Sequence, residues 1–426
     1  MRTRLAWLLA ASAVLGSLVA GFVDHRPRAL VDWRSLRAVA LESDDWGLPG
    51  YVPDAHALDG VDRAALGGTH FPDVYWNSTL ESAADLDAMV ALMRRHHARD
   101  GLPAVFQPNM ILKPQLPGLD SPYHRPGLAE AERRAVASGT WQPEIHGADH
   151  IDPARRDEAL TDPDPVLAQA ASRGVLVFPR SHTAFELGPQ RPLADVRRSW
   201  EPLPRRFEDR FGQPATAVIA PDYVWDGRHE GLFRDLGLRI VQAKDHQRQL
   251  GLVGPQHWRD VRRLALRLWD RWRVRDLVYL DRNAFFETAH AEDPRALVRS
   301  CADQVRGAWR RGEPAIVETH RVGFVQVEPG AGAEGRALLD SLLTDLDASA
   351  PLYVSDAELA GLARRGISAV RRGPVWVLRN PGPAHRLAIL PTDGPRASPA
   401  RIGVPARTTL VLDRTSLAVL QRLPLR

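Results

Sequence analysis

Three groups of polar residues end or follow apolar runs at separate places in the sequence, and their types could do chemistry together. The first group is the adjacent pair Asp44 and Asp45. The second is the pair His146 and His150, and the third is His320 alone. Carboxylates and imidazoles hold divalent cations and move protons, so the three groups predict metal-assisted acid–base chemistry if the fold brings them to one place.

The two adjacent acids place a condition on the backbone. Neighbouring side chains of a continuing strand point to opposite faces of a sheet. Asp44 and Asp45 can therefore approach one site only if the strand ends there and the chain turns, which Gly47 permits. The alternative interpretation is that one of the acids caps a helix.

The spacing of the histidine pair favours a shared ligand. His150 lies four positions after His146, which brings two imidazoles to one side of a single helical turn. The alternative is a structural histidine beside an exposed one. Cys301 is the only cysteine, so a disulfide within the chain and a thiolate cluster are both excluded, and any metal must be held by histidine and carboxylate.

Short β-type apolar runs alternate with longer helical patterns along the chain. Strands that alternate with helices imply parallel pairing in an α/β fold. The pattern predicts strands at 37–42, 103–107, 143–146, 175–178, 215–220, 239–242, 277–280, 315–318 and 352–354. It predicts helices at 83–99, 128–138, 230–236 and 294–311.

This arrangement favours an irregular (β/α) barrel over an open sheet. No glycine-rich phosphate loop follows the first strand, and polar residues follow several different strands, as they do where a barrel builds its active site. The 426-residue chain has room for a large domain and an appendage. We expect the barrel over residues 35–365. Helical periodicity then stops, and short β-like segments predict a small C-terminal β module over 370–426.

The N-terminus and the charge bear on location and partners. Arg2 and Arg4 precede the uncharged apolar stretch 5–23, which predicts a signal peptide or an N-terminal membrane anchor within residues 1–25. The rest of the chain is then expected to be secreted, periplasmic or membrane-anchored facing the outside. The net charge is only +4 and no long run of like charges occurs, so a nucleic-acid partner is not expected.

Taken jointly, the three groups resemble the motifs of the polysaccharide deacetylases, a family of carbohydrate esterases. Members carry an Asp-Asp motif after the first strand, a His-x-x-x-His motif after a later strand and a Leu-x-His motif near the end of the barrel. The segments that correspond here are 43–47, 146–150 and 318–320. Their order and approximate spacing agree with the family, and the resemblance covers residues 38–325.

The resemblance implies a metal-dependent hydrolase that removes N-acetyl or O-acetyl groups from a cell-envelope or exported polysaccharide. It implies that Asp45, His146 and His150 bind a divalent metal, usually zinc, with cobalt, nickel or manganese in some relatives. Asp44 would be the general base and His320 the general acid. Such a cation keeps open positions for water and an acyl oxygen, lowers the pKa of the water and polarises the carbonyl.

Two departures from the family pattern concern the surroundings of these residues. Trp46 stands between the acids and Gly47, and we expect its ring to bind a sugar, since flat aromatic faces suit apolar C–H patches. The family's Arg-x-Pro-Tyr segment is replaced by residues 220–223. The resemblance leaves Tyr223 as a substrate-binding residue through its backbone amide, whereas the arginine that orients the base is missing.

Two other functions stay open from the sequence alone. A glycoside hydrolase on a related barrel would use two carboxylates about 5 to 10 Å apart, here Glu318 and Asp44, and would leave the histidine pair without a task. A catalytically degenerate barrel that only binds polysaccharide would fit the missing arginine and the altered first motif. Retention of all three expected metal ligands argues against that second alternative.

Overall fold

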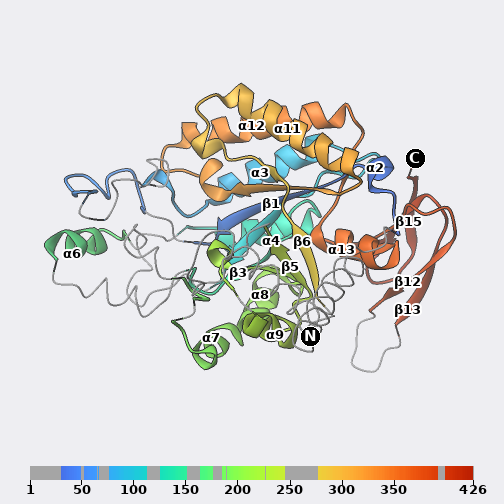
Figure 1. Cartoon of the computed structure of the whole chain (residues 1–426), viewed down its shortest axis with the longest axis horizontal. Coiled ribbons are helices and arrows are strands. Elements are labelled where there is room, and N and C mark those ends of the chain that lie inside the picture. Colours follow the sequence, from blue (N-terminus) through green and yellow to red (C-terminus); the bar gives the residue numbers. More distant parts are fainter. Residues whose placement is uncertain are drawn as a thin grey trace, which may run out of the picture.

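A curled sheet of parallel strands forms the centre of the structure (Figure 1). The computed structural model describes residues 30–425 except 49–51, 65, 67–75, 113–124, 151–163, 176–184, 189, 226, 245–276 and 392–398. Within these residues the sheet contains β1 (Ala38–Trp46), β2 (Gln107–Ile111), β3 (Glu144–Gly147), β4 (Ala217–Ile219), β5 (Ile240–Ala243), β6 (Val278–Asp281), β7 (Ala284–Phe285), β8 (Ala315–His320) and β9 (Leu352–Tyr353). Their order is β6-β5-β4-β3-β2-β1-β8-β7, and β9 pairs with β1.

The two end strands of the sheet, β6 and β7, are consecutive in the sequence, and the short connection between them closes the barrel. β6 and β7 are the two ends of the path of strands, yet only Arg282 and Asn283 separate them in the sequence. The side chain of Asn283 accepts a hydrogen bond from the Ile316 amide at 2.9 Å, which ties this crossing to β8. The crossing therefore holds Arg282 where the first and last strands of the path meet.

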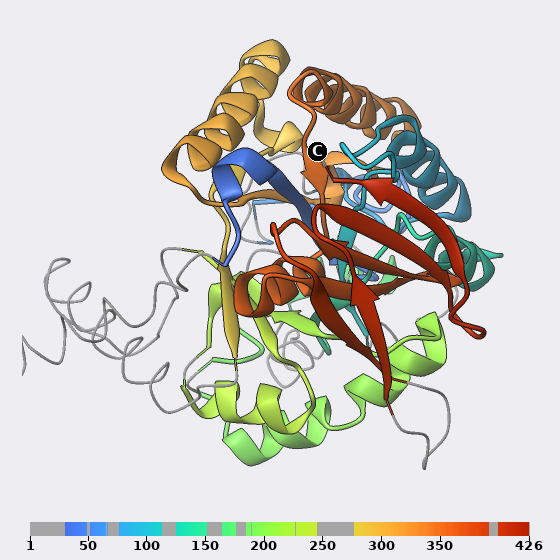
Figure 2. The same ribbon diagram turned by 90° about the vertical axis from the view of Figure 1, so that its right-hand side faces the viewer.

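Helices lie around the outside of the curled sheet (Figures 1 and 2). They are α2 (Trp33–Leu36), α3 (Ala83–Arg95), α4 (Leu128–Ala137), α6 (Pro165–Ser172), α7 (Leu193–Trp200), α8 (Leu203–Phe211), α9 (Gly227–Asp235), α11 (Pro294–Arg311), α12 (Pro329–Asp347) and α13 (Asp356–Arg365). Three single turns of 3-10 helix, η3 (Pro221–Tyr223), η4 (Thr288–His290) and η5 (Arg321–Gly323), follow strands or precede helices. The predicted α/β barrel is confirmed.

Local chemistry explains the bounds of α11, which match the prediction. Asp293 caps the helix by accepting hydrogen bonds from the amides of residues 295 and 296, and Pro294 fills the first helical position, where an amide would be unpaired anyway. Gly312 ends the helix with a φ of +76°. The buried stripe consists of Cys301, Ala302, Val305, Ala308 and Trp309, so the lone cysteine is part of the core.

Two antiparallel sheets form the predicted β module at the C-terminus (Figure 2). One sheet has the order β10-β11-β14-β15, and the other pairs β12 with β13. The strands are β10 (Ser368–Arg372), β11 (Val375–Asn380), β12 (Arg386–Leu390), β13 (Ala400–Val404), β14 (Thr408–Asp413) and β15 (Val419–Pro424). Between the sheets lies an apolar cluster of Ile367, Leu378, Ala388, Leu390, Val404, Leu410 and Leu412.

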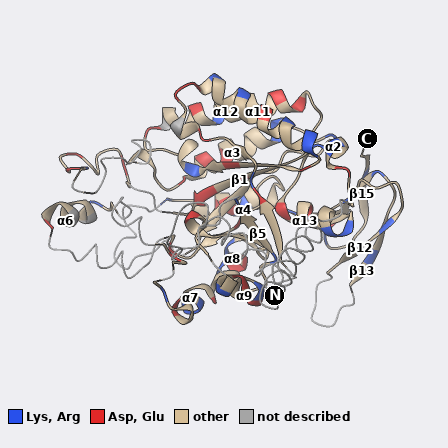
Figure 3. Cartoon of the chain, viewed as in Figure 1, with Lys and Arg blue, Asp and Glu red and all other residues tan. Residues whose placement is uncertain are grey.

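Most predicted strands coincide with observed strands, and two do not. The strand predicted at 103–107 begins only at Gln107, and the one predicted at 175–178 falls largely outside the described residues, as does the apolar stretch 5–23. Among the helices described, none is both long and apolar enough to cross a bilayer. Figure 3 shows basic and acidic residues interspersed along α11 and α12.

Candidate active site

The end of β1 presents both adjacent acids because its backbone departs from regular strand geometry. β1 continues through Trp46, but its pairing with β2 shifts register between Ser43 and Trp46. Asp45 adopts a left-handed φ of +69°. This irregularity interrupts the strict alternation of side chains, so that Asp44 and Asp45 can serve one site. The expected turn is thus made at Asp45 itself.

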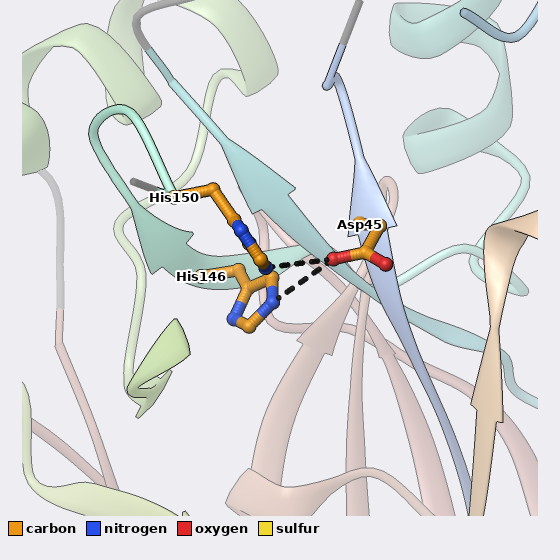
Figure 4. Close-up of side chains that lie close together, drawn as sticks. All are labelled: Asp45, His146 and His150. Atoms are coloured by element: carbon orange, nitrogen blue, oxygen red, sulfur yellow. Dashed lines mark ion pairs between the residues drawn. The ribbon is translucent and has the colours of Figure 1, made fainter. Parts of the chain in front are cut away.

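Asp45, His146 and His150 lie close together (Figure 4). Oδ1 of Asp45 is 3.3 Å from Nε2 of His146 and 3.1 Å from Nε2 of His150. The backbone between the histidines is not helical, in contrast to the expectation from their spacing. His146 lies on β3, and a turn with positive φ at Gly147 and His150 brings the second ring back toward the first.

The three ligand atoms fit a divalent cation. Two atoms bound to one tetrahedral zinc ion with bonds of 2.0–2.1 Å lie about 3.3 Å apart, which is close to the Asp45–histidine distances. The main-chain carbonyl of Ile219 lies 3.2 Å from Nδ1 of His146, where it can accept a hydrogen bond from a protonated Nδ1 and leave Nε2 free of a proton as a ligand. Two imidazoles and one carboxylate leave coordination positions open, as in catalytic zinc sites.

Electrostatics favour an anionic Asp45 between the imidazoles. Burial acts to raise the pKa of Asp45, but hydrogen bonds to His146 and His150 outweigh it and hold the pKa well below its usual range. Burial acts to lower the pKa of His150, but the hydrogen bond and charge of Asp45 outweigh it and raise the pKa to about 9. The Asp45 carboxylate is therefore ionised and can bind a cation, which would take the place of the proton on His150.

Asp44 and His320 face each other across neighbouring strands. They are register partners in the β1–β8 pairing, and Nε2 of His320 lies 3.8 Å from Oδ2 of Asp44. The Nδ1 atom of His320 contacts Oε1 of Glu287 at 2.8 Å. Burial alone would lower the pKa of His320, but the charge and hydrogen bond of Glu287 raise it to about 10. His320 is thus an imidazolium at neutral pH.

Arg282 supplies the cation that the motif comparison left missing beside Asp44. Its NH1 and NH2 groups each donate a hydrogen bond of 2.7 Å to Asp44, one to each carboxylate oxygen. Asn109 donates a further bond of 2.7 Å to Oδ1 of Asp44. Burial acts to raise the pKa of Asp44, but Arg282 outweighs it and the pKa lies well below its usual value. Asp44 is therefore ionised and fixed in orientation.

A buried polar core holds Arg282 in turn. Its Nε group donates to Glu42 at 2.6 Å, and its NH2 group donates to Gln242 at 3.1 Å. Arg282 was not among the residues predicted from the sequence, although it directly follows β6 at the carboxyl end of that strand. The same positional rule that singled out Asp44 and His320 would have found it.

Two predicted substrate contacts need correction. Trp46 is completely buried, because its ring packs edge-on against Phe106 and Trp141 and its Nε1 group donates to Ser43. It therefore belongs to the core and presents no face to a sugar. The backbone amide of Tyr223 donates to the Ala220 carbonyl at 3.0 Å, so it is engaged within η3 instead of pointing to a substrate.

The side chain of Tyr223 nevertheless belongs to the site. Its hydroxyl accepts a hydrogen bond of 2.8 Å from Arg282. Lys244 lies 5.4 Å from the centre of the Tyr223 ring and forms an ion pair with Glu318 at 2.8 Å. Glu287, Glu318 and His320 also lie close enough to be considered as metal ligands. Lys244 already neutralises Glu318, however, and this leaves the Asp45 cluster as the better cation site.

No protein-family model and no curated protein matches the sequence. Among solved structures, a putative polysaccharide deacetylase from Mycobacterium smegmatis is similar, with 12% identity over 77% of this chain and 90% of that chain and a TM-score of 0.42. A pseudoenzyme of carbohydrate esterase family 4 from Bacillus anthracis has 10% identity over 74% of this chain and 62% of its own, with a TM-score of 0.32.

The similar structures also include a protein that is not named as a polysaccharide deacetylase. PuuE allantoinase has 10% identity over 78% of this chain and 92% of its own, with a TM-score of 0.42. At such identities and scores, these likenesses add no argument about chemistry. The solved structures to which this chain is similar thus include polysaccharide deacetylases, the family that its sequence motifs resemble.

Proposed function

We propose that this protein is a metal-dependent hydrolase that removes acetyl groups from a polysaccharide outside the cytoplasm. The single observation that carries the proposal is the position of Asp45, His146 and His150 beside the pair formed by Asp44 and His320. A candidate cation site, an ionised carboxylate and a protonated imidazole together provide what metal-assisted hydrolysis of an acyl group uses: an electrophile, a general base and a general acid. All three lie at one end of the strands.

Each protein side chain has a definite task in this proposal. When bound, the divalent cation supplies polarisation of the acyl carbonyl and lowers the pKa of water. Asp44, which Arg282 keeps ionised and oriented, accepts a proton from the attacking water. His320 donates its Nε2 proton to the departing atom of the sugar, and Glu287 holds the other ring nitrogen.

The protonated state of His320 favours an N-acetyl substrate as the first candidate. An amide nitrogen must be protonated to depart, whereas an ester oxygen depends less on an acid. His320 carries a proton at neutral pH because Glu287 raises its pKa. The proposed substrate class is therefore a polymer of N-acetylated amino sugars, with an O-acetylated polysaccharide as the second candidate.

One assay separates this proposal from the two alternatives. The purified protein is analysed for zinc, cobalt, nickel and manganese and then incubated with N-acetylated amino-sugar oligomers, with and without a chelator. We expect acetate release that the chelator stops and added metal restores. Shortened oligomers without acetate release would support a glycoside hydrolase, and oligomer binding without any release would support a polysaccharide-binding protein.

The glycoside hydrolase alternative has weaker support at its two carboxylates. Asp44 and Glu318 are both buried, and each is already paired with a cation, Arg282 and Lys244 respectively. A general acid for glycosidic cleavage needs a raised pKa, but Arg282 lowers the pKa of Asp44. These pairings favour the deacetylase.

Export is part of the proposal because the substrate lies outside the cell. The uncharged stretch 5–23 behind Arg2 and Arg4 has the composition of a signal peptide or membrane anchor. Fractionation of cells that express the full chain, followed by N-terminal sequencing, tests this part. Recovery of the uncleaved protein in the cytosol would contradict it.

A further inference from the structure

The buried carboxylate of Glu186 binds the backbone of the turn that carries His150, one of the candidate metal ligands. Glu186 is fully buried and lies between β3 and α7 in the sequence. Its carboxylate accepts hydrogen bonds from three consecutive backbone amides, those of Ala148, Asp149 and His150, at 3.0, 3.1 and 2.8 Å. The indole Nε1 group of Trp200 donates a further bond of 2.7 Å.

The turn after β3 is shaped around this carboxylate. Successive amides that converge on one anion form a concave backbone nest. His150 closes the nest in a left-handed conformation with a φ of +68°, which a residue with a side chain seldom adopts without support. Gly147 has a φ of +123°, and a Cβ there would lie 2.6 Å from Oε2 of Glu186. The glycine and the glutamate therefore fit each other.

The same turn sets the distance between the two histidine ligands. His146 is fixed on β3, whereas His150 reaches Asp45 only because residues 147–150 curl back. The hydrogen bond to the His150 amide is the shortest of the three backbone contacts to Glu186. Loss of the carboxylate would free this turn and let the His150 ring move away from Asp45.

We propose that Glu186 is a positioning residue that preorganises His150 for metal binding. It touches neither substrate nor cation, and it acts only through the backbone that bears the ligand. This inference depends on the proposed function only in taking Asp45, His146 and His150 as a metal site. The side-chain amide of a glutamine at position 186 would point its own N–H groups at the backbone N–H groups of residues 148–150. Even this replacement of nearly equal shape therefore breaks the nest.

The test is the zinc affinity of the metal-free full chain, measured by competition with a chromophoric chelator. We expect Glu186→Gln to weaken zinc binding by about 10–100-fold, the usual effect of losing a partner that orients a ligand. Glu186→Asp keeps the charge on a shorter stem and should restore part of the affinity. The visible spectrum of bound Co(II) should change in both variants, because it reports the geometry of the ligands.

A matched control separates positioning from general stability. Glu358 is also a buried carboxylate that accepts a backbone amide, that of Ser355 at 2.8 Å, but it lies on α13 and binds Arg372 and Arg379 of the C-terminal module. Glu358→Gln should lower Tm and leave the zinc affinity and the Co(II) spectrum unchanged. If Glu186→Gln does not fold, Trp200→Phe removes one donor to the carboxylate, and we expect a several-fold loss of zinc affinity.

Two results would overturn the inference, and they have different meanings. If Glu186→Gln or, in its place, Trp200→Phe folds and binds zinc as tightly as the native chain, Glu186 has no positioning role, although the deacetylase proposal survives. If the native chain itself binds no zinc and gives no Co(II) spectrum, the metal site of the proposed function fails and this inference fails with it.

Discussion

Two regions of the molecule bury charged side chains, and they do so in different ways. Where the C-terminal module meets the barrel, Arg379 binds Asp100 at 2.8 Å and Glu358 at 2.7 Å, and Arg372 binds Glu358 at 2.5 Å. Two guanidinium groups thus balance two carboxylates. These side chains are nearly inaccessible to water, so this network has the character of a structural joint.

The mouth of the barrel is unbalanced by comparison. Among the described residues, the four carboxylates of Asp44, Asp45, Glu287 and Glu318 accompany two permanent cations, Arg282 and Lys244. Asp45 and His320 keep 17% and 22% of their side-chain surface exposed. A surplus of negative charge that solvent can reach suits a site that takes up a cation and protons. Both regions contain buried ion pairs, so burial of charge does not by itself indicate function; the partly exposed surplus of negative charge distinguishes the site from the joint.

Removing the shared carboxylate of the metal cluster should have the largest effect. Asp45→Asn takes away the carboxylate of the described Asp45–His146–His150 cluster, so zinc affinity should fall by more than the ~10–100-fold that loss of an outer partner costs. Acetate release should become undetectable, while Tm of the metal-free protein changes little. Competition binding and the acetate assay measure both effects. Zinc binding of native strength would place the metal elsewhere.

Removing Arg282 should damage both activity and stability. Arg282→Met leaves Asp44 and Glu42 buried without their cation, which costs about 3–5 kcal/mol in the free energy of unfolding. Because burial then raises the pKa of Asp44, the acidic limb of the pH–rate profile should move to higher pH. Arg282→Lys is the control: it keeps a charge but loses the paired hydrogen bonds, so kcat should fall with a smaller loss of stability.

Breaking the structural joint should affect stability alone. Arg379→Met leaves Asp100 and Glu358 short of a cation, and about 3–5 kcal/mol of unfolding free energy should be lost. Urea denaturation measures the loss. The folded fraction should retain native zinc affinity and kcat, because the joint is separate from the metal cluster. A changed zinc affinity would show that the two regions are coupled.

The smallest expected effect is a displacement of the pH profile. Glu287 raises the pKa of His320 to about 10, so the acid is protonated below that pH and activity should decline as the pH rises through it. Glu287→Gln removes the charge, the pKa of His320 falls, and the alkaline limb should move to lower pH. Tm should scarcely change, since Glu287 is a quarter exposed. An unmoved limb would exclude His320 as the acid.

The sequence predicted the parts of the molecule that local pattern controls. The helix at 294–311 has its predicted bounds because its capping residue, its first proline and its final glycine are adjacent in the chain. The positions of Asp44 and His320 at the ends of β1 and β8 followed from apolar runs that stop at polar residues. Such signals need no knowledge of distant contacts.

Other parts of the site depend on contacts that no local pattern contains. Arg282 meets Asp44 although 238 positions separate them, because the barrel closes between β6 and β7. Trp46 was expected to bind a sugar, but the irregularity at Asp45 turns its ring into the core against Phe106 and Trp141. In both cases the path of the backbone, not the residue type, decided the role.

Residue types and their spacing along the chain account for the side chains that are available: the acids, the histidines, and the apolar runs that carry them to the ends of strands. Periodicity and residue chemistry are local properties, so they can be recognised in the sequence without knowledge of the fold. Contacts between distant segments place Arg282 beside Asp44, bring Glu186 to the backbone amides of the His150 turn and bury Trp46. Those outcomes depend on strand register and barrel closure, which arise from packing between distant segments.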